Sequence, residues 1–210
     1  MTRVLIATSN AGKVRDFAGA AAQYGIVVEV IPNFASMPAV VEDGATFEAN
    51  ARKKAETYSL SVPGEVVIAD DSGLEVDALG GLPGVHSARY AADEPHAAES
   101  NTDDDANNVK LIREIKRVPA EKRTGRFVCW IAVARDGKTV AIFEGKAEGI
   151  ILERPQGRNG FGYDPLFFFP SIQKTFAELT AEEKADYSHR GAAFRKFLQW
   201  MKVLEERCFS

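Results

Sequence analysis

The 210-residue chain has little of several residue types, and each shortage narrows what it can be. It has two cysteines and no zinc-ligand spacing; Cys129 is expected to be a buried thiol and Cys208 an incidental one. It has no basic excess: 26 Lys and Arg against 30 Asp and Glu give a net charge of −4. A broad nucleic-acid face is therefore not expected, although a few clustered lysines could hold a small anion. No signal peptide or membrane-spanning run is visible, so we expect a cytoplasmic protein without a membrane partner.

What the chain does contain is typical of one globular α/β domain spanning residues 1–210. Its hydrophobic content of 45% suits a sizeable core. Residues 4–7 predict a strand, the stripe from Val14 to Tyr24 a helix, and residues 26–31 a second strand. A strand–helix–strand opening favours parallel pairing in the sheet.

The rest of the chain predicts further helices and an inserted lobe of antiparallel strands. A helix is expected from Thr46, another over residues 107–115, and a last one capped by Ser188. Asp136-Gly137-Lys138, between two apolar runs, predicts a hairpin. Residues 93–105 are acidic and are expected to form a surface loop.

The most informative motif is Asp70-Asp71-Ser72-Gly73, directly after the apolar residues 66–69. We expect the strand to end there and the two carboxylates to point to opposite faces. Residues 74–79, in which apolar and polar residues alternate, could continue as a strand. Adjacent like charges need compensation, and a divalent metal or nearby lysines would supply it. A tight turn would explain one of the two aspartates but not both.

Four other motifs could carry phosphate chemistry, and each also has an ordinary structural explanation. Residues 8–13 join a strand to a helix and would offer backbone N–H groups to an anion, or form a capped turn. Glu42-Asp43-Gly44 could supply a second metal-binding carboxylate, or cap a turn. Residues 160–165 place an aromatic ring between two glycines, where it could stack on a base, whereas the apolar residues 166–169 that follow are expected to be a core strand. Lys184 and residues 188–191 bring Lys, His and Arg donors to a helix start.

Taken together and in this order, the motifs resemble one family, the inosine/xanthosine triphosphate pyrophosphatases. The matching segments are residues 8–13, 42–47, 50–55, 69–74, 79–85, 87–90, 160–165 and 188–191. The resemblance implies a central mixed sheet with flanking helices, in two lobes with the active site in a cleft between them. It also implies a homodimer, a Mg²⁺ requirement, and hydrolysis of ITP, dITP and XTP to the nucleoside monophosphate and pyrophosphate.

The resemblance further implies a role for individual residues. Asp71 would be the general base and, with Glu42, a metal ligand, while Asp70 would support it. Phe161 would stack on the nucleobase, and four further residues would close over it: Asp164, Lys184, His189 and Arg190. Substrate contacts would come from Thr8, Ser9, Asn10, Ala11, Gly12, Lys13, Lys54, Ser72, Phe161, Gly162, Tyr163, Asp164, Lys184, His189 and Arg190.

Two points of the match stay open. The family often has Glu three residues after the loop lysine, whereas this chain has Asp16, whose shorter reach leaves its role open. The family's helix lysine aligns best with Lys54, with Lys53 as the alternative.

Two other functions remain to be distinguished. A nucleotide-binding sensor would need the lysines and the aromatic ring but not both Glu42 and Asp71. A pyrophosphatase for modified pyrimidines would share the phosphate site, and Ser188-His189-Arg190 argues against it. A panel of triphosphates would separate all three.

Overall fold

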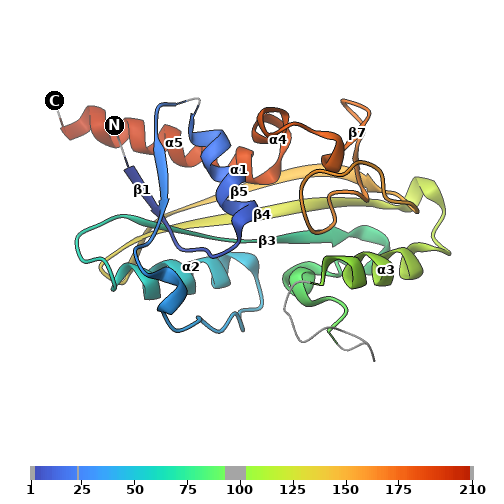
Figure 1. Ribbon diagram of the computed structural model, residues 1–210, viewed down its shortest axis with the longest axis horizontal. Helices are drawn as coiled ribbons and strands as arrows, with labels where there is room; N and C mark the ends of the chain where they lie inside the picture. Colours follow the sequence, from blue (N-terminus) through green and yellow to red (C-terminus); the bar gives the residue numbers. More distant parts are fainter. Residues whose placement is uncertain (1–2, 23, 93–102, 209–210) are drawn as a thin grey trace. The chain divides into compact units, whose positions relative to one another are not determined.

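The computed structural model contains two compact units, and it describes residues 3–22, 24–92 and 103–208 (Figure 1). Unit 1 comprises Met1–Asp71, Cys129–Lys146 and Ala185–Ser210. Unit 2 comprises Ser72–Val128 and Ala147–Lys184. The chain thus enters unit 2 directly after Asp71, within a strand that both units share.

A mixed seven-stranded sheet runs in the order β2-β1-β3-β4-β5-β6-β7. The strands are β1 (Arg3–Ile6), β2 (Val27–Val30), β3 (Val67–Val76), β4 (Thr124–Arg135), β5 (Lys138–Ile151), β6 (Phe167–Phe169) and β7 (Lys174–Thr175). The helices are α1 (Ala11–Ala22), α2 (Phe47–Ser59), α3 (Asp104–Ile115), α4 (Ala181–Tyr187) and α5 (His189–Cys208). Short 3-10 helices cover Phe34–Ser36, Asp77–Leu79, Gly84–Arg89, Ala120–Lys122 and Phe176–Glu178.

The opening of the chain confirms the predicted strand–helix–strand unit. Strand β1 pairs in parallel with both β2 and β3, and α1 connects β1 to β2. Strands β5, β6 and β7 pair antiparallel, so the sheet is mixed, as predicted.

Helices cover both faces of the sheet in unit 1, with α1 and α5 on one face and α2 on the other (Figure 1). Alternate strand residues serve the two faces, because successive side chains of a strand point in opposite directions. Ile6 and Ile68 pack with Phe17 and Phe194 of α1 and α5. Residues 5, 67 and 69 instead pack with residues of α2. The alternation along β3 decides which helix each aspartate will meet.

Unit 2 has a core of its own. Leu111 and Ile115 of α3 pack with β-strand side chains and with a group of aromatic rings. Phe127, Phe167 and Phe176 form the centre of that group, with ring centroids 4.7 to 5.6 Å apart. The predicted core strand at residues 166–169 corresponds to β6: Leu166 and Phe167 are fully buried, and Phe168 and Phe169 are half-buried.

The β4–β5 turn confirms the predicted hairpin. Asp136 and Gly137 both have positive φ, of 50° and 77°, the conformation that two-residue hairpin turns require. The last helix also begins where predicted: the Ser188 hydroxyl accepts a hydrogen bond from the Gly191 N–H at 3.1 Å. Cys129 is a buried free thiol, as expected, and its pKa is raised by burial and then by Asp70.

Two sequence predictions about element ends are wrong. Strand β3 does not end before Asp70 but continues to Val76, so the acidic motif lies inside a ten-residue strand and not at its edge. The alternative that residues 74–79 continue as a strand is confirmed as far as Val76, after which Asp77–Leu79 forms a 3-10 helix. Helix α3 begins at Asp104, three residues before the expected start, because the side chain of Asp103 caps the Ala106 N–H. Of the predicted surface loop, residues 93–102 lie outside the described residues, and the remainder belongs to this helix start.

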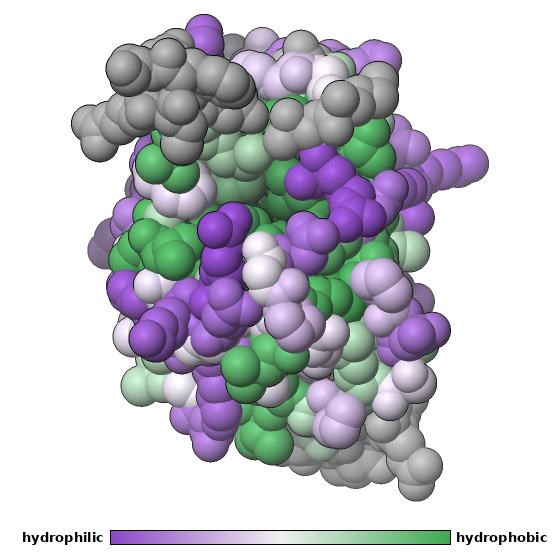
Figure 2. Space-filling model, turned by 90° about the vertical axis from the view of Figure 1, so that its left-hand side faces the viewer, coloured by the Kyte–Doolittle hydropathy of each residue, from purple (hydrophilic) through white to green (hydrophobic). Residues whose placement is uncertain are grey.

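Among the residues that the structure describes, no helix is both long enough and apolar enough to cross a membrane. On the face drawn in Figure 2, hydrophobic residues lie in several areas separated by hydrophilic ones. Exposed apolar side chains include those of Tyr24, Val27 and Val30, in and next to the edge strand β2.

Candidate active site

The two aspartates of β3 point to opposite faces, as the alternation of a strand requires. Asp70 follows Ile68 on the face covered by α1 and α5, and Asp71 follows Ala69 on the face covered by α2. Both are buried. A buried carboxylate costs several kcal/mol unless it is paired, so the partners on each face decide its chemistry.

Asp70 lies among cations. Its Oδ2 is 3.0 Å from Lys13 Nζ of α1 and 3.5 Å from Arg190 Nε of α5. Burial alone would raise the pKa of Asp70, but Lys13, then Arg190 and Lys54, hold it well below its usual range. Asp70 is therefore ionised at neutral pH and does not exchange protons there.

Asp16, which is partly buried, belongs to the same network. Its Oδ2 accepts a hydrogen bond from Arg190 Nη1 at 3.1 Å, so this side chain joins α1 to α5. The sequence analysis left its role open because aspartate is shorter than glutamate; the contact with Arg190, 174 positions away in the chain, is visible only in the structure.

Asp71 has the opposite electrostatic character. Its Oδ2 accepts a hydrogen bond from Asn50 Nδ2 at 2.9 Å, and its Oδ1 is 3.8 Å from Lys54 Nζ. Burial raises the pKa of Asp71 above its usual range, Glu42 raises it further, and Lys54, Lys13 and Asn50 oppose that shift. A carboxylate with a raised pKa is a stronger proton acceptor, which suits a general base.

Asn50 is a site residue that the sequence analysis did not single out. It is almost fully buried in the first turn of α2. Its Oδ1 accepts from the Gly44 N–H at 2.8 Å while its Nδ2 donates to Asp71. One side chain therefore ties the acidic loop at residues 42–44 to the candidate base. The sequence signal that could have identified Asn50 is its position: it is a polar residue on the otherwise apolar side of α2.

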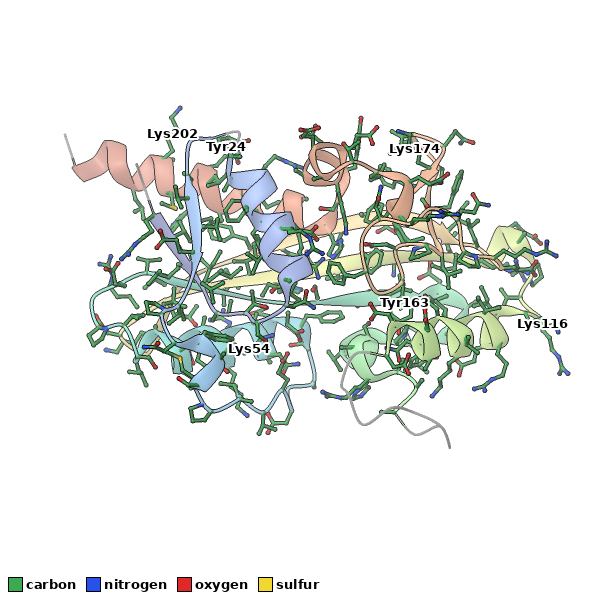
Figure 3. All side chains as sticks on the ribbon, in the orientation of Figure 1. Tyr24, Lys54, Lys116, Tyr163, Lys174 and Lys202 are labelled. Atoms are coloured by element: carbon green, nitrogen blue, oxygen red, sulfur yellow. The ribbon has the colours of Figure 1, made fainter. Side chains whose placement is uncertain are left out.

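Lys54 occupies the position between the two acidic motifs. Its Nζ is 2.8 Å from Glu42 Oε2 and 3.8 Å from Asp71 Oδ1. Burial would lower its pKa, but Asp71, Asp70 and Glu42 outweigh burial and raise it. Lys53 instead pairs with Asp43 at the surface. Figure 3 labels Lys54 on α2, and Lys116 and Lys202 at the periphery; Lys54 is buried and the other two are exposed.

Glu42 and Asp71 form the candidate metal-binding pair. Both carboxylates lie within 4 Å of the same ammonium group, and carboxylate oxygens are the ligands that Mg²⁺ prefers. No group of three or more His, Cys, Asp or Glu that could hold a metal ion occurs among the described residues. A pair of carboxylates nevertheless fits Mg²⁺, which commonly takes one or two protein carboxylates together with phosphate oxygens and water.

The predicted phosphate loop forms the start of α1. Asn10 caps the helix, accepting from the Lys13 N–H at 3.1 Å, and Thr8 Oγ1 accepts from the Asn10 N–H at 3.2 Å. Ala11, Gly12 and Lys13 form the first helical turn, and Ser9 is exposed. Backbone N–H groups at a helix start, together with the Lys13 ammonium, make this segment a suitable anion site.

Three of the residues expected near the nucleobase, Phe161, Asp164 and Lys184, form a compact group in unit 2. Asp164 Oδ2 accepts from the Phe161 N–H at 2.9 Å and from Lys184 Nζ at 2.6 Å. Lys184 Nζ also lies 4.8 Å from the centre of the Phe161 ring. The buried Tyr163 donates its hydroxyl to the Ser87 carbonyl at 2.8 Å. Asp164 thus orients both the ring and the lysine.

The remaining predicted residues divide between the two units. Ser72 is half-buried in β3, where unit 2 begins. His189 and Arg190 open α5 in unit 1 and are buried. The structure therefore places Arg190 beside the phosphate-loop lysine and Asp70, and contact of Arg190 with a nucleobase stays a prediction from the resemblance.

Comparison with known proteins matches nearly the whole chain. The sequence model of the Ham1 family covers residues 4–200. This chain belongs to the Ham1 family. A relative called dITP/XTP pyrophosphatase, from Geobacillus kaustophilus, is 48% identical over 206 residues, covering 97% of each chain. A protein of the same name from Acidobacterium capsulatum is 50% identical over 194 residues, covering 92% of this chain and 95% of its own.

Solved structures of Ham1 proteins confirm the fold. The Ham1 protein of Staphylococcus aureus superimposes with a TM-score of 0.79 at 37% identity, covering 96% of this chain and 99% of its own. A Ham1 protein from Coxiella burnetii gives a TM-score of 0.78 at 35% identity, covering 98% and 100%. The predicted α/β class, with helices flanking a mixed sheet, is thereby confirmed.

Proposed function

We propose that this chain hydrolyses the non-standard purine nucleoside triphosphates ITP, dITP and XTP to the nucleoside monophosphate and pyrophosphate, with Mg²⁺. Family membership and the names of its relatives support the reaction class. The observation that carries the assignment of roles is the division between the two β3 aspartates. Asp70 is held ionised by Lys13 and Arg190, whereas Asp71 has a raised pKa.

Asp71 is the proposed general base. It accepts a proton from the attacking water, whose oxygen forms a bond to the α-phosphorus as the bond from phosphorus to the bridging oxygen of the departing pyrophosphate breaks. Asn50 holds Oδ2 of Asp71 and so orients the carboxylate. Asp70 keeps Lys13 in place at the start of α1, where Lys13 and the backbone N–H groups bind phosphate oxygens.

Glu42 and Asp71 are the proposed Mg²⁺ ligands. The ion would neutralise charge on the phosphate oxygens. Lys54, which lies between the two carboxylates, would add a positive charge to the same region. Phosphoryl transfer depends mainly on positioning and charge neutralisation, so these cations are expected to carry much of the rate enhancement.

Selection of the base is proposed to depend on hydrogen-bond donors facing the 6-oxo group. Hypoxanthine and xanthine accept hydrogen bonds at a position where adenine has an amino group, so adenine would leave buried donors unpaired. Phe161 would stack on the base, with Lys184 beside it. Equal kcat/KM for ITP and ATP would contradict this account.

The decisive experiment measures pyrophosphate release from a panel of dITP, ITP, XTP, ATP, GTP and a modified UTP. We expect release from the first three, loss of activity with EDTA, and recovery with Mg²⁺. Binding without turnover would indicate the sensor function, and preference for modified UTP the pyrimidine function.

The test of Asp71 uses Asp71→Asn, for which we expect kcat to fall by about three orders of magnitude or more, in the range of general-base and charge contributions. Asp43→Asn is the matched control, since Asp43 is an exposed neighbour of Glu42 and pairs with Lys53 at the surface. Near-normal turnover of Asp71→Asn would show that Asp71 is not the base.

A further inference from the structure

Two side chains of α3 hold both backbone polar groups of Gly162. Asp104 Oδ2 accepts from the Gly162 N–H at 2.7 Å, and Asn108 Nδ2 donates to the Gly162 carbonyl at 2.9 Å. The two side chains lie four residues apart and therefore on one face of the helix. All three residues belong to unit 2.

The segment they hold is intrinsically loose. Gly160 and Gly162 both have positive φ, of 78° and 60°, a conformation that glycine adopts readily and other residues rarely do. A Cβ on Gly160 would come within 2.0 Å of Asp164 Oδ2, so that glycine is also required by space. Two glycines next to one aromatic residue increase the entropy that ordering the loop must overcome.

Phe161 lies between these two glycines, and hydrogen bonds hold the backbone on both sides of it. Its own N–H donates to Asp164, and the next residue is held by Asp104 and Asn108. Asp164 also binds Lys184 beside the ring. The direction of the Phe161 side chain therefore depends on α3 as well as on its own loop.

We propose that Asp104 and Asn108 are positioning residues for nucleobase binding, acting through Gly162 to hold Phe161 in the orientation that stacks on a purine. The inference rests on the proposed function. None of the predicted site residues lies in α3. The inference therefore makes α3 a further element that determines affinity for the base.

The test compares Asn108→Ala and Asp104→Ala with Asp105→Ala. Asp105 is an exposed carboxylate in the same first turn of α3. Asp105→Ala removes the same charge from the helix as Asp104→Ala does, but it keeps both hydrogen bonds to Gly162. One lost hydrogen bond should raise KM for dITP about fivefold while kcat changes little. Asp105→Ala should leave KM unchanged. Asp104→Asn, which keeps an acceptor oxygen, should restore most of the affinity.

Two further readouts separate positioning from general damage. Inhibition by inorganic triphosphate, which has no base, should be the same in wild type and Asn108→Ala. In a Phe161→Ala background, Asn108→Ala should add little to KM, since both substitutions act on one ring.

Independent, additive effects in the two backgrounds would overturn the proposal, as would weakened triphosphate inhibition or an unchanged KM in both α3 variants. Thermal unfolding of each variant shows whether it folds. If an alanine variant does not fold, KM of Asp104→Asn is compared with that of wild type instead. Failure of the wild-type protein to release pyrophosphate from dITP would instead contradict the proposed function.

Discussion

At the scale of single residues, the site depends on an asymmetry between neighbours. Asp70 and Asp71 are identical in chemistry and adjacent in sequence, yet the pKa of one is lowered and that of the other raised. The cause is the partners on each face: Lys13 and Arg190 for Asp70, and burial near Glu42 for Asp71. An acidic pair can thus provide one fixed charge and one proton acceptor.

The pH dependence of activity tests the environment of Asp71. Because its pKa is raised, the acid limb of kcat/KM for the free enzyme should lie above pH 3.8, the ordinary value for an aspartate. Asn50→Ala removes a hydrogen bond that lowers this pKa, so the limb should move to higher pH. Glu42→Gln removes a nearby negative charge and should move it to lower pH. Shifts in the same direction would contradict the assignment of Asp71 as the titrating group.

At the scale of elements, α2 carries the greatest share of the proposed catalytic machinery. It supplies Asn50 from its first turn and Lys54 one turn later, and both reach Asp71 from the same side of the sheet. Thr46 caps the helix, its hydroxyl accepting from the Ala49 N–H at 3.1 Å. The cap therefore fixes the turn from which Asn50 projects.

Removal of this cap should destabilise the protein measurably. We expect Thr46→Ala to lower the free energy of unfolding in urea by about 1 kcal/mol, because the Ala49 N–H loses its acceptor. Thr57→Ala is the matched control: Thr57 is exposed on the same helix, and its hydroxyl donates back to the Lys53 carbonyl at 2.7 Å. Its effect should stay within about 0.5 kcal/mol. Equal losses in both variants would show that the cap is not responsible.

At the scale of the whole molecule, the two aspartates should affect stability in opposite ways. The lowered pKa of Asp70 means that its ionised form stabilises the fold; that contribution is complete above the unfolded-state pKa near 3.8 and is lost as pH falls through the folded-state value. The raised pKa of Asp71 means that its ionised form is disfavoured by folding at neutral pH.

Urea unfolding of two variants at pH 7 measures this difference. Asp70→Asn should lose on the order of 3 kcal/mol, because Lys13 and Arg190 lose a buried counter-charge. Asp71→Asn should lose none, or gain stability. Wild type should lose stability between pH 5 and pH 2 more steeply than Asp70→Asn. Similar losses for the two variants at pH 7 would contradict the opposite pKa shifts.

The homodimer expected from the resemblance is also a prediction at this scale. Sedimentation equilibrium should give twice the mass of one chain at micromolar concentration. A monomer at every concentration tested would contradict it, and activity under those conditions would show that the site is complete within one chain.

Hydrophobic period, turn residues and caps act over short distances, so the class of fold, the hairpin at Asp136-Gly137 and the strand-to-helix loop at residues 8–13 could be predicted from the sequence. The strand alternation also predicted that Asp70 and Asp71 point to opposite faces. Which of the two is held ionised could not be predicted. That outcome depends on partners from α1, α2 and α5 that are distant in the chain, and on burial, which no local pattern measures. The extension of β3 through the acidic motif has the same cause: strand pairing and two helical layers outweighed the cost of placing adjacent carboxylates within a strand.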